Sequence, residues 1–207
     1  MVKQKINLAD QLKSGKTKLR HTQTKVKNPD GLTTTHELLS DGTTRVYDDA
    51  TPGIGYVVDM NPDLTYCLVL PGVMLGSQHV AHDLDILTHN NVTHIINVAT
   101  DVKNLFEDNF IYKTFEAYDK PTHRLINIFD ECCEIIHTAI SSGGCVLVHC
   151  NGGISRSTTI IAAFLIKHHN MNPNEALTFI KQQRPFVNPN SGFMQQLQEY
   201  HENITQG

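Results

Sequence analysis

The stretch from Cys145 to Ile166 constrains the fold more than any other part of this chain of 207 residues. It begins with the apolar run Cys-Val-Leu-Val, which is rich in β-branched residues and typical of a buried strand. Gly152 and Gly153 then interrupt the run, and after Arg156 the chain is apolar on nearly every side, as in a buried helix. A buried strand joined to a buried helix by a glycine loop predicts half of a βα unit.

The loop between this strand and this helix is a predicted anion site. The first N–H groups of a helix have no partners within it, and the helix dipole favours negative charge there. Cys150 enters the loop, and both the helix start and the guanidinium of Arg156 favour its thiolate form. The planar guanidinium can also bind two oxygens of one phosphate. We therefore predict a phosphoryl site whose rim is the backbone of Asn151, Gly152, Gly153, Ile154 and Ser155.

The pattern His149-Cys150-x-x-Gly153-x-x-Arg156-Ser157 resembles the signature of the cysteine-dependent protein phosphatases. The alternative is a structural buried cysteine, with Arg156 paired to a surface carboxylate. The motif fixes five residue types at set spacing where a strand meets a helix, which favours the phosphatase interpretation. The resemblance implies that Cys150 is the nucleophile and that Arg156 binds the phosphate. It also implies that the Ser157 hydroxyl donates to the sulfur, although serine is common in the first turn of any helix.

Cleavage of a phosphate ester needs a proton donor for the leaving oxygen. Asp119 is our candidate, because it lies 31 residues before Cys150 in a predicted loop ahead of the helix that precedes the catalytic strand. This position resembles the general-acid loop of the dual-specificity phosphatases. An ordinary loop aspartate is the alternative, and Asp101, Asp108 and Glu116 are rival acids.

Further segments narrow the resemblance. The chain has no Trp and so lacks the Trp-Pro-Asp loop of tyrosine-specific enzymes, and residues 151–155 lack the basic residues typical of inositol-lipid phosphatases. Residues 65–203 resemble the atypical dual-specificity phosphatases, in particular those that regulate stress-activated kinase pathways. The segments that carry this likeness are Leu70-Pro71, Leu75-Gly76-Ser77, 94–99, Arg184-Pro185, Pro189-Asn190-Ser191-Gly192-Phe193 and Gln196-Leu197. The resemblance implies a pocket shallow enough for phosphoserine, phosphothreonine and phosphotyrosine.

Hydrophobic periodicity predicts alternating strands and helices after residue 65, hence an α/β fold with a mostly parallel sheet covered by helices on both faces. The resemblance implies the protein-tyrosine-phosphatase-like form of this fold, with five strands. Predicted strands are 66–70, 73–75, 92–99, 111–117 and 145–149, and predicted helices are 79–90, 125–140, 156–169, 172–183 and a last helix from about 191.

Residues 1–64 are polar and are predicted to form an N-terminal extension, partly disordered or draped on the catalytic domain of residues 65–207. Lysines and an arginine gather between residues 13 and 27. This stretch is either a solvated charged tail or a docking segment for an acidic groove on a partner.

Composition excludes several classes of function. The net charge of −4 does not favour nucleic-acid binding, and no apolar run approaches the ~18 residues of a membrane span. The five cysteines have no C-x-x-C spacing, so we predict neither a zinc site nor a disulfide framework. Free cysteines are typical of a reducing compartment, so we predict a cytoplasmic or nuclear location. His79, His82 and Asp83 could share a helical face, but we predict no metal and no cofactor.

We therefore predict a protein phosphatase that acts through a phosphocysteine on phosphorylated proteins, including kinases of a MAP-kinase or stress-kinase pathway. The alternative is a scaffold for proteins of such a pathway, with catalysis secondary. A phosphatase acting on RNA or lipid is a weaker third hypothesis.

Overall fold

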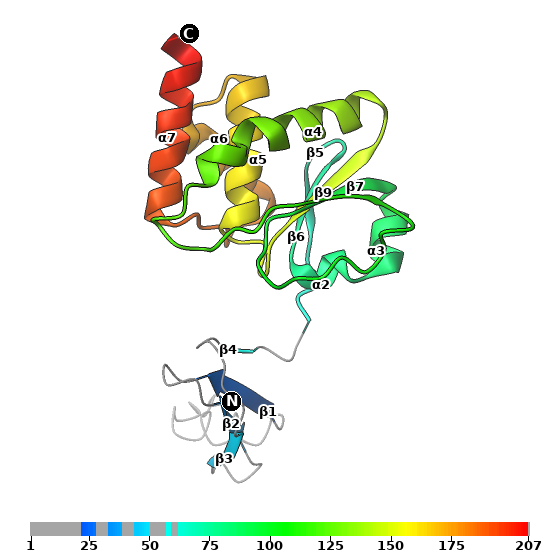
Figure 1. Ribbon diagram of the computed structural model, residues 1–207, viewed down its shortest axis with the longest axis vertical. Coiled ribbons are helices and arrows are strands. Elements are labelled where there is room, and N and C mark those ends of the chain that lie inside the picture. Colours follow the sequence, from blue (N-terminus) through cyan, green and yellow to red (C-terminus); the bar gives the residue numbers. More distant parts are fainter. Residues whose placement is uncertain (1–21, 28–32, 39–43, 50–56, 59–61, 207) are drawn as a thin grey trace, which may run out of the picture. The chain divides into compact units, whose positions relative to one another are not determined.

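The computed structural model describes residues 22–27, 33–38, 44–49, 57–58 and 62–206, and the chain divides into two compact units, Met1–Pro62 and Asp63–Gly207. The described part of the first unit is an antiparallel sheet in the order β3-β2-β1-β4 (Figure 1). Its strands are β1 (Thr22–Lys27), β2 (Thr33–Leu38), β3 (Thr44–Asp49) and β4 (Val57–Val58). These four strands were not predicted, because their sequences contain few large apolar residues. The remainder of the predicted extension, with most of its lysine-rich stretch, lies outside the described residues.

The second unit contains a five-stranded sheet in the order β5-β6-β9-β7-β8. The strands are β5 (Cys67–Leu70), β6 (Val73–Gly76), β7 (Val92–Asn97), β8 (Ile111–Thr114) and β9 (Cys145–His149). Only β5 runs antiparallel to its neighbour, and the pairs β6–β9, β9–β7 and β7–β8 are parallel. The predicted mostly parallel five-stranded sheet is confirmed, and the sheet is mixed rather than purely parallel.

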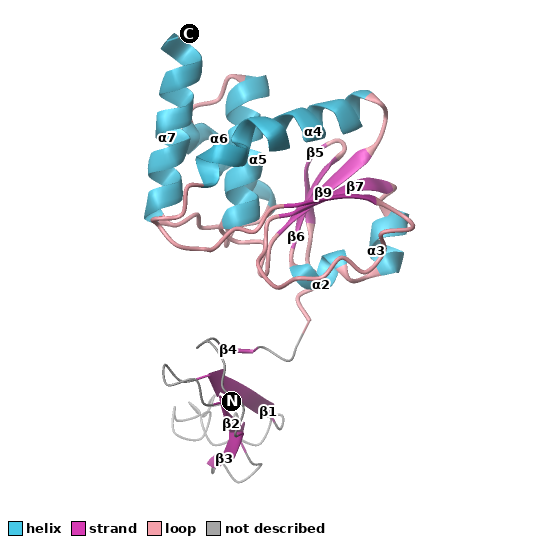
Figure 2. Ribbon diagram, in the orientation of Figure 1, coloured by secondary structure: helices cyan, strands magenta, loops and turns pink. Residues whose placement is uncertain are grey.

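Helices cover both faces of this sheet (Figure 2). One face carries α4 (Phe129–Ser141), α5 (Arg156–His169), α6 (Pro173–Gln183) and α7 (Ser191–Gln206), with the 3₁₀ helix η1 (Leu125–Ile128) leading into α4. The other face carries two short helices, α2 (Gln78–Ala81) and α3 (Leu84–His89). The single predicted helix over 79–90 is wrong, because the Asp83 side chain accepts from the N–H of Ile86 and caps a new helix there.

Side chains of the central strand β9 point alternately to the two faces of the sheet, and each face has its own hydrophobic cluster. Val146 and Val148 of β9 belong to the large cluster beneath α4 to α7, together with Cys150. Cys145 and Leu147 belong to the small cluster beneath α2 and α3. Because β9 is buried on both faces, it forms a rigid support, and the predicted anion loop begins at its carboxyl end.

Candidate active site

The loop Asn151–Ser155 joins β9 to α5, and all five of its carbonyls face protein donors. The carbonyls of Asn151 and Ile154 accept from the N–H groups of Gln78 and Asn188 at 3.0 and 2.9 Å. The carbonyls of Gly152 and Gly153 accept from the guanidinium of Arg184, and that of Ser155 accepts from Thr159 in α5. Each carbonyl of the loop is therefore held on the outside of its curve.

The N–H groups of the same five residues have no such partners. Within the described part of the chain, none of them donates to a protein acceptor. In a planar trans peptide the N–H points opposite to the C=O of the preceding residue. The outward carbonyls of residues 151–154 consequently turn the N–H groups of residues 152–155 toward the hollow of the loop, which makes a concave anion site at the start of α5.

Arg156 is the first residue of α5 and is 8% exposed. Its Nη1 donates to the Ala117 carbonyl at 2.9 Å, and its Nη2 donates to Asn151 Oδ1 at 2.5 Å. Its Nε is buried without a hydrogen-bond partner. Since buried donors are almost always paired in native proteins, this orphaned Nε indicates an acceptor that arrives with a ligand. An anion binding both Nε and Nη2 would replace the contact with Asn151.

Cys150 lies at the bottom of the loop, 2% exposed, with its Sγ 3.2 Å from the Ser157 hydroxyl oxygen. The predicted pair is therefore within hydrogen-bond distance. His149 is fully buried beneath the loop, and burial lowers its pKa to about 4. Its Nδ1 lies 3.4 Å from the Cys150 carbonyl oxygen. A neutral, buried imidazole there supports the backbone and is not placed to exchange protons with solvent.

Asp119 lies against this loop as predicted from its position in the chain. Its Oδ1 accepts from the Ser155 hydroxyl and from the Asn190 side-chain amide, each at 2.8 Å. Its Oδ2 lies 3.8 Å from the orphaned Nε of Arg156. Two donors thus fix one carboxyl oxygen, while the other faces the place where a bound anion would lie.

The rival acids differ from Asp119 in their contacts. Asp101, Asp108 and Glu116 are exposed, and within the described part of the chain no hydrogen bond or ion pair joins their side chains to the loop.

The three residues considered as metal ligands in the sequence each have another contact. His79 Nδ1 accepts from the N–H of Asp63, a ring nitrogen of His82 lies 2.9 Å from the Lys103 carbonyl, and Asp83 caps α3.

Sequence reasoning missed two residues of the site. Asn190 was named only within a segment that carries the family likeness, and in the structure its Oδ1 accepts from the N–H of Phe193 at the start of α7. Its side-chain amide additionally holds Asp119. Arg184 was named only within a segment that carries the family likeness, and no local pattern signalled that its guanidinium contacts the carbonyls of the loop glycines.

A family model described as dual specificity phosphatase, catalytic domain, matches residues 73–203. The chain belongs to the dual-specificity phosphatase family. It is 44% identical over 148 residues to dual specificity protein phosphatase 19 of Mus musculus, covering 72% of this chain and 67% of that protein. The predicted dual-specificity phosphatase family and the predicted enzyme class, a protein phosphatase, are therefore confirmed.

Solved structures share the fold of this phosphatase. A human tyrosine phosphatase-like serine/threonine/tyrosine-interacting protein is 34% identical, with a TM-score of 0.66 over 69% of this chain and 98% of that one. A mouse putative dual specificity phosphatase, solved in complex with zinc tungstate, is 26% identical, with a TM-score of 0.67 over 72% of this chain and 93% of that one.

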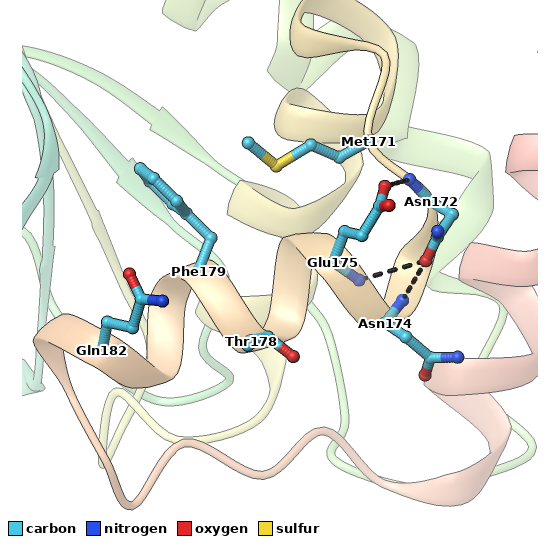
Figure 3. Close-up of a pocket in the computed structure, with 7 residues that line it drawn as sticks. All are labelled: Met171, Asn172, Asn174, Glu175, Thr178, Phe179 and Gln182. Atoms are coloured by element: carbon cyan, nitrogen blue, oxygen red, sulfur yellow. Dashed lines mark hydrogen bonds between the residues drawn. The ribbon is translucent and has the colours of Figure 1, made fainter.

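A hollow of about 550 Å³ lies along α6, and none of the residues that line it belongs to the catalytic motif (Figure 3). It is lined by Met171, Asn172, Asn174, Glu175, Thr178, Phe179 and Gln182. Asn172 and Glu175 are joined there by the hydrogen bonds of a capping box, which explains the polar side chains of this hollow without a ligand.

Among the described residues, no helix is long and apolar enough to cross a membrane.

Proposed function

We propose that this phosphatase hydrolyses phosphotyrosine and phosphoserine or phosphothreonine in proteins through a phosphocysteine formed on Cys150. The observation that supports this most strongly is the convergence of unpaired donors, the loop N–H groups and the buried Nε of Arg156, above the sulfur. A tetrahedral oxyanion supplies acceptors for all of them. The mouse relative complexed with zinc tungstate agrees with this proposal, since tungstate is an oxyanion of that shape.

In the first step the Cys150 thiolate attacks phosphorus, an S–P bond forms and the P–O bond to the substrate oxygen breaks. Arg156 and the loop N–H groups hold the three remaining oxygens, whose charge they stabilise. Asp119 gives its proton to the leaving oxygen. Oδ2 is the suitable atom, because Oδ1 already accepts from Ser155 and Asn190 while Oδ2 faces Arg156.

In the second step water attacks the phosphorus of the phosphocysteine. Asp119, now a carboxylate, takes the proton of that water, the S–P bond breaks and inorganic phosphate is released. The electron pair of the broken bond returns to sulfur. The Ser157 hydroxyl, 3.2 Å from Sγ, donates to the departing thiolate and stabilises it.

We further propose that the substrates include kinases of a stress-activated or MAP-kinase pathway, in the cytoplasm or nucleus. The likeness of the motifs to phosphatases of such pathways supports this, and the lysine-rich stretch of residues 13–27 offers a means of docking on an acidic partner.

The test of the reaction is Cys150→Ser. A hydroxyl occupies nearly the same space but is hardly ionised near neutral pH, so turnover of an aryl phosphate should fall at least about 10³-fold while inorganic phosphate still binds. Cys145→Ser, on the opposite face of the same strand, is the matched control and should retain activity. A rate within tenfold of wild type in Cys150→Ser would refute the nucleophile.

A scaffold role is the second candidate, favoured by the fold shared with a human protein named as an interacting protein. Cells lacking the protein distinguish the two roles. If Cys150→Ser restores the cellular effect as well as wild type does, the scaffold role holds; if it restores none, catalysis is required.

A further inference from the structure

The structure assigns Arg184 as a positioning residue of the phosphate-binding loop, an assignment that rests on the proposed function of that loop. Arg184 follows α6 and is only 2% exposed. Arginine is almost never fully buried unless its charge is paired and its donors are satisfied, so a guanidinium in this place has a specific task.

All five N–H donors of this guanidinium have acceptors. Nε donates to the Gly153 carbonyl at 3.1 Å, and Nη2 donates to the Gly152 carbonyl at 3.2 Å. Nη2 also donates to Asp63 Oδ2 at 3.0 Å, and Nη1 donates to the carbonyl and the hydroxyl of Thr65 at 2.8 and 3.0 Å. The guanidinium therefore spans two separate segments, the loop and residues 63–65.

The two loop contacts determine where the phosphate donors point. The peptide carbonyl of Gly152 is in one plane with the N–H of Gly153, and that of Gly153 with the N–H of Ile154. No cis peptide occurs among the described residues, so each N–H points opposite to its carbonyl. By holding both carbonyls from behind, Arg184 turns these two N–H groups toward the anion.

Arg184 holds the two glycine carbonyls, whereas the other carbonyls of the loop have different donors. Those of Asn151 and Ile154 accept from the backbone N–H groups of Gln78 and Asn188, and that of Ser155 accepts from the N–H and the hydroxyl of Thr159. The flexible centre of the loop, formed by the two glycines, depends instead on the guanidinium. Its positive charge also lies behind the loop proposed to bind a dianion, and a nearby cation favours such an anion.

Asp63 and Thr65 fix the guanidinium from the other side. Asp63 Oδ1 accepts from the N–H and the hydroxyl of Thr65, and the Asp63 carbonyl accepts from Ser77 at 2.6 Å. The Phe186 ring covers the guanidinium, with its centroid 4.4 Å from Cζ. Arg184 is thus held in one orientation, as a positioning residue must be.

The test uses Arg184→Lys, which keeps the charge but replaces the fork with a single ammonium that cannot reach both carbonyls and Thr65. We expect its dissociation constant for inorganic phosphate, measured by calorimetry, to rise about tenfold or more and kcat/KM for an aryl phosphate to fall up to about 10²-fold. In NMR spectra of the phosphate-free protein, the backbone amide chemical shifts of Gly153 and Ile154 should change. Arg124→Lys is the matched control, because Arg124 makes a two-bond pair with Glu199 on the exposed surface.

A folded Arg184→Lys protein that binds phosphate within twofold of wild type would overturn the assignment. If Arg184→Lys does not fold, Asp63→Asn decides, with Glu199→Gln as its control. Asp63→Asn keeps an oxygen acceptor but removes the charge that fixes Nη2, so phosphate should bind more weakly than in the control, and equal binding overturns the assignment. Wild-type protein that binds phosphate but cleaves no ester would refute the proposed reaction and leave this binding test valid.

Discussion

Replacing Gly153 by alanine should disable the phosphate loop, whereas the same change at Gly152 should not. Gly153 has φ of 66°, and a Cβ added there would lie 2.6 Å from the carbonyl oxygen of Gly76. The left-handed conformation costs an L-residue roughly 1–2 kcal/mol. The contact is with backbone of the buried strand β6, so the loop itself must give way by at least about 0.4 Å to reach the shortest separation that real Cβ atoms show.

That displacement carries the Gly153 and Ile154 N–H groups with it. A misplacement of about 1 Å can cost about 10²-fold in rate, so we expect Gly153→Ala to lose more than tenfold in kcat/KM on an aryl phosphate and about 2 kcal/mol of unfolding free energy. Steady-state kinetics and urea unfolding measure the two quantities.

Gly152→Ala is the control within the same loop. Its Cβ would meet only the end of the Ile154 side chain, at 3.3 Å, and that side chain can rotate away. We expect activity within about twofold of wild type, in line with the weak steric demand. Equal losses in the two variants, or none in Gly153→Ala, would refute the argument from close approach.

Three more predictions follow from the site. Asp119→Asn should slow hydrolysis of a phosphothreonine peptide by about 10²–10⁴-fold and of an activated aryl phosphate far less, because only the alkoxide needs a proton, and Glu116→Gln should show no such difference. His149 must stay neutral in the folded state, with a pKa of about 4 against 6.5 unfolded. The unfolded state therefore binds more protons between these values, and stability should fall as pH drops through this window by up to about 3 kcal/mol; urea unfolding of His149→Gln should lack this loss. Peroxide should inactivate Cys150 without a disulfide to Cys145, since the two side chains join opposite core clusters, and non-reduced digests analysed by mass spectrometry would reveal a linked peptide if this is wrong.

The sequence predicted the parts of this site that are local in the chain. Cys150 and Arg156 could be predicted as site residues because the strand, the glycine loop and the helix that position them follow one another directly in the sequence. Asp119 was predicted from its place 31 residues before Cys150, in a loop ahead of the helix that leads to β9, because that place resembles the general-acid loop of the family. The first sheet escaped notice because strands such as Thr22–Lys27 and Thr33–Leu38 carry few large apolar side chains, so hydrophobic periodicity gives no signal there.

Arg184 shows why the remaining contacts could not be predicted. Hydrophobic patterns report which residues enter a core, and an arginine next to a proline at the end of an amphipathic helix predicts an exposed side chain. The actual partners of Arg184 lie 31 and 32 residues before it in the loop and 119 and 121 residues before it at Thr65 and Asp63. Those contacts exist only once β5, the loop and α6 have been brought together by apolar packing. The sequence alone therefore predicts which side chains would react, whereas the polar contacts that orient them become visible only in the folded chain.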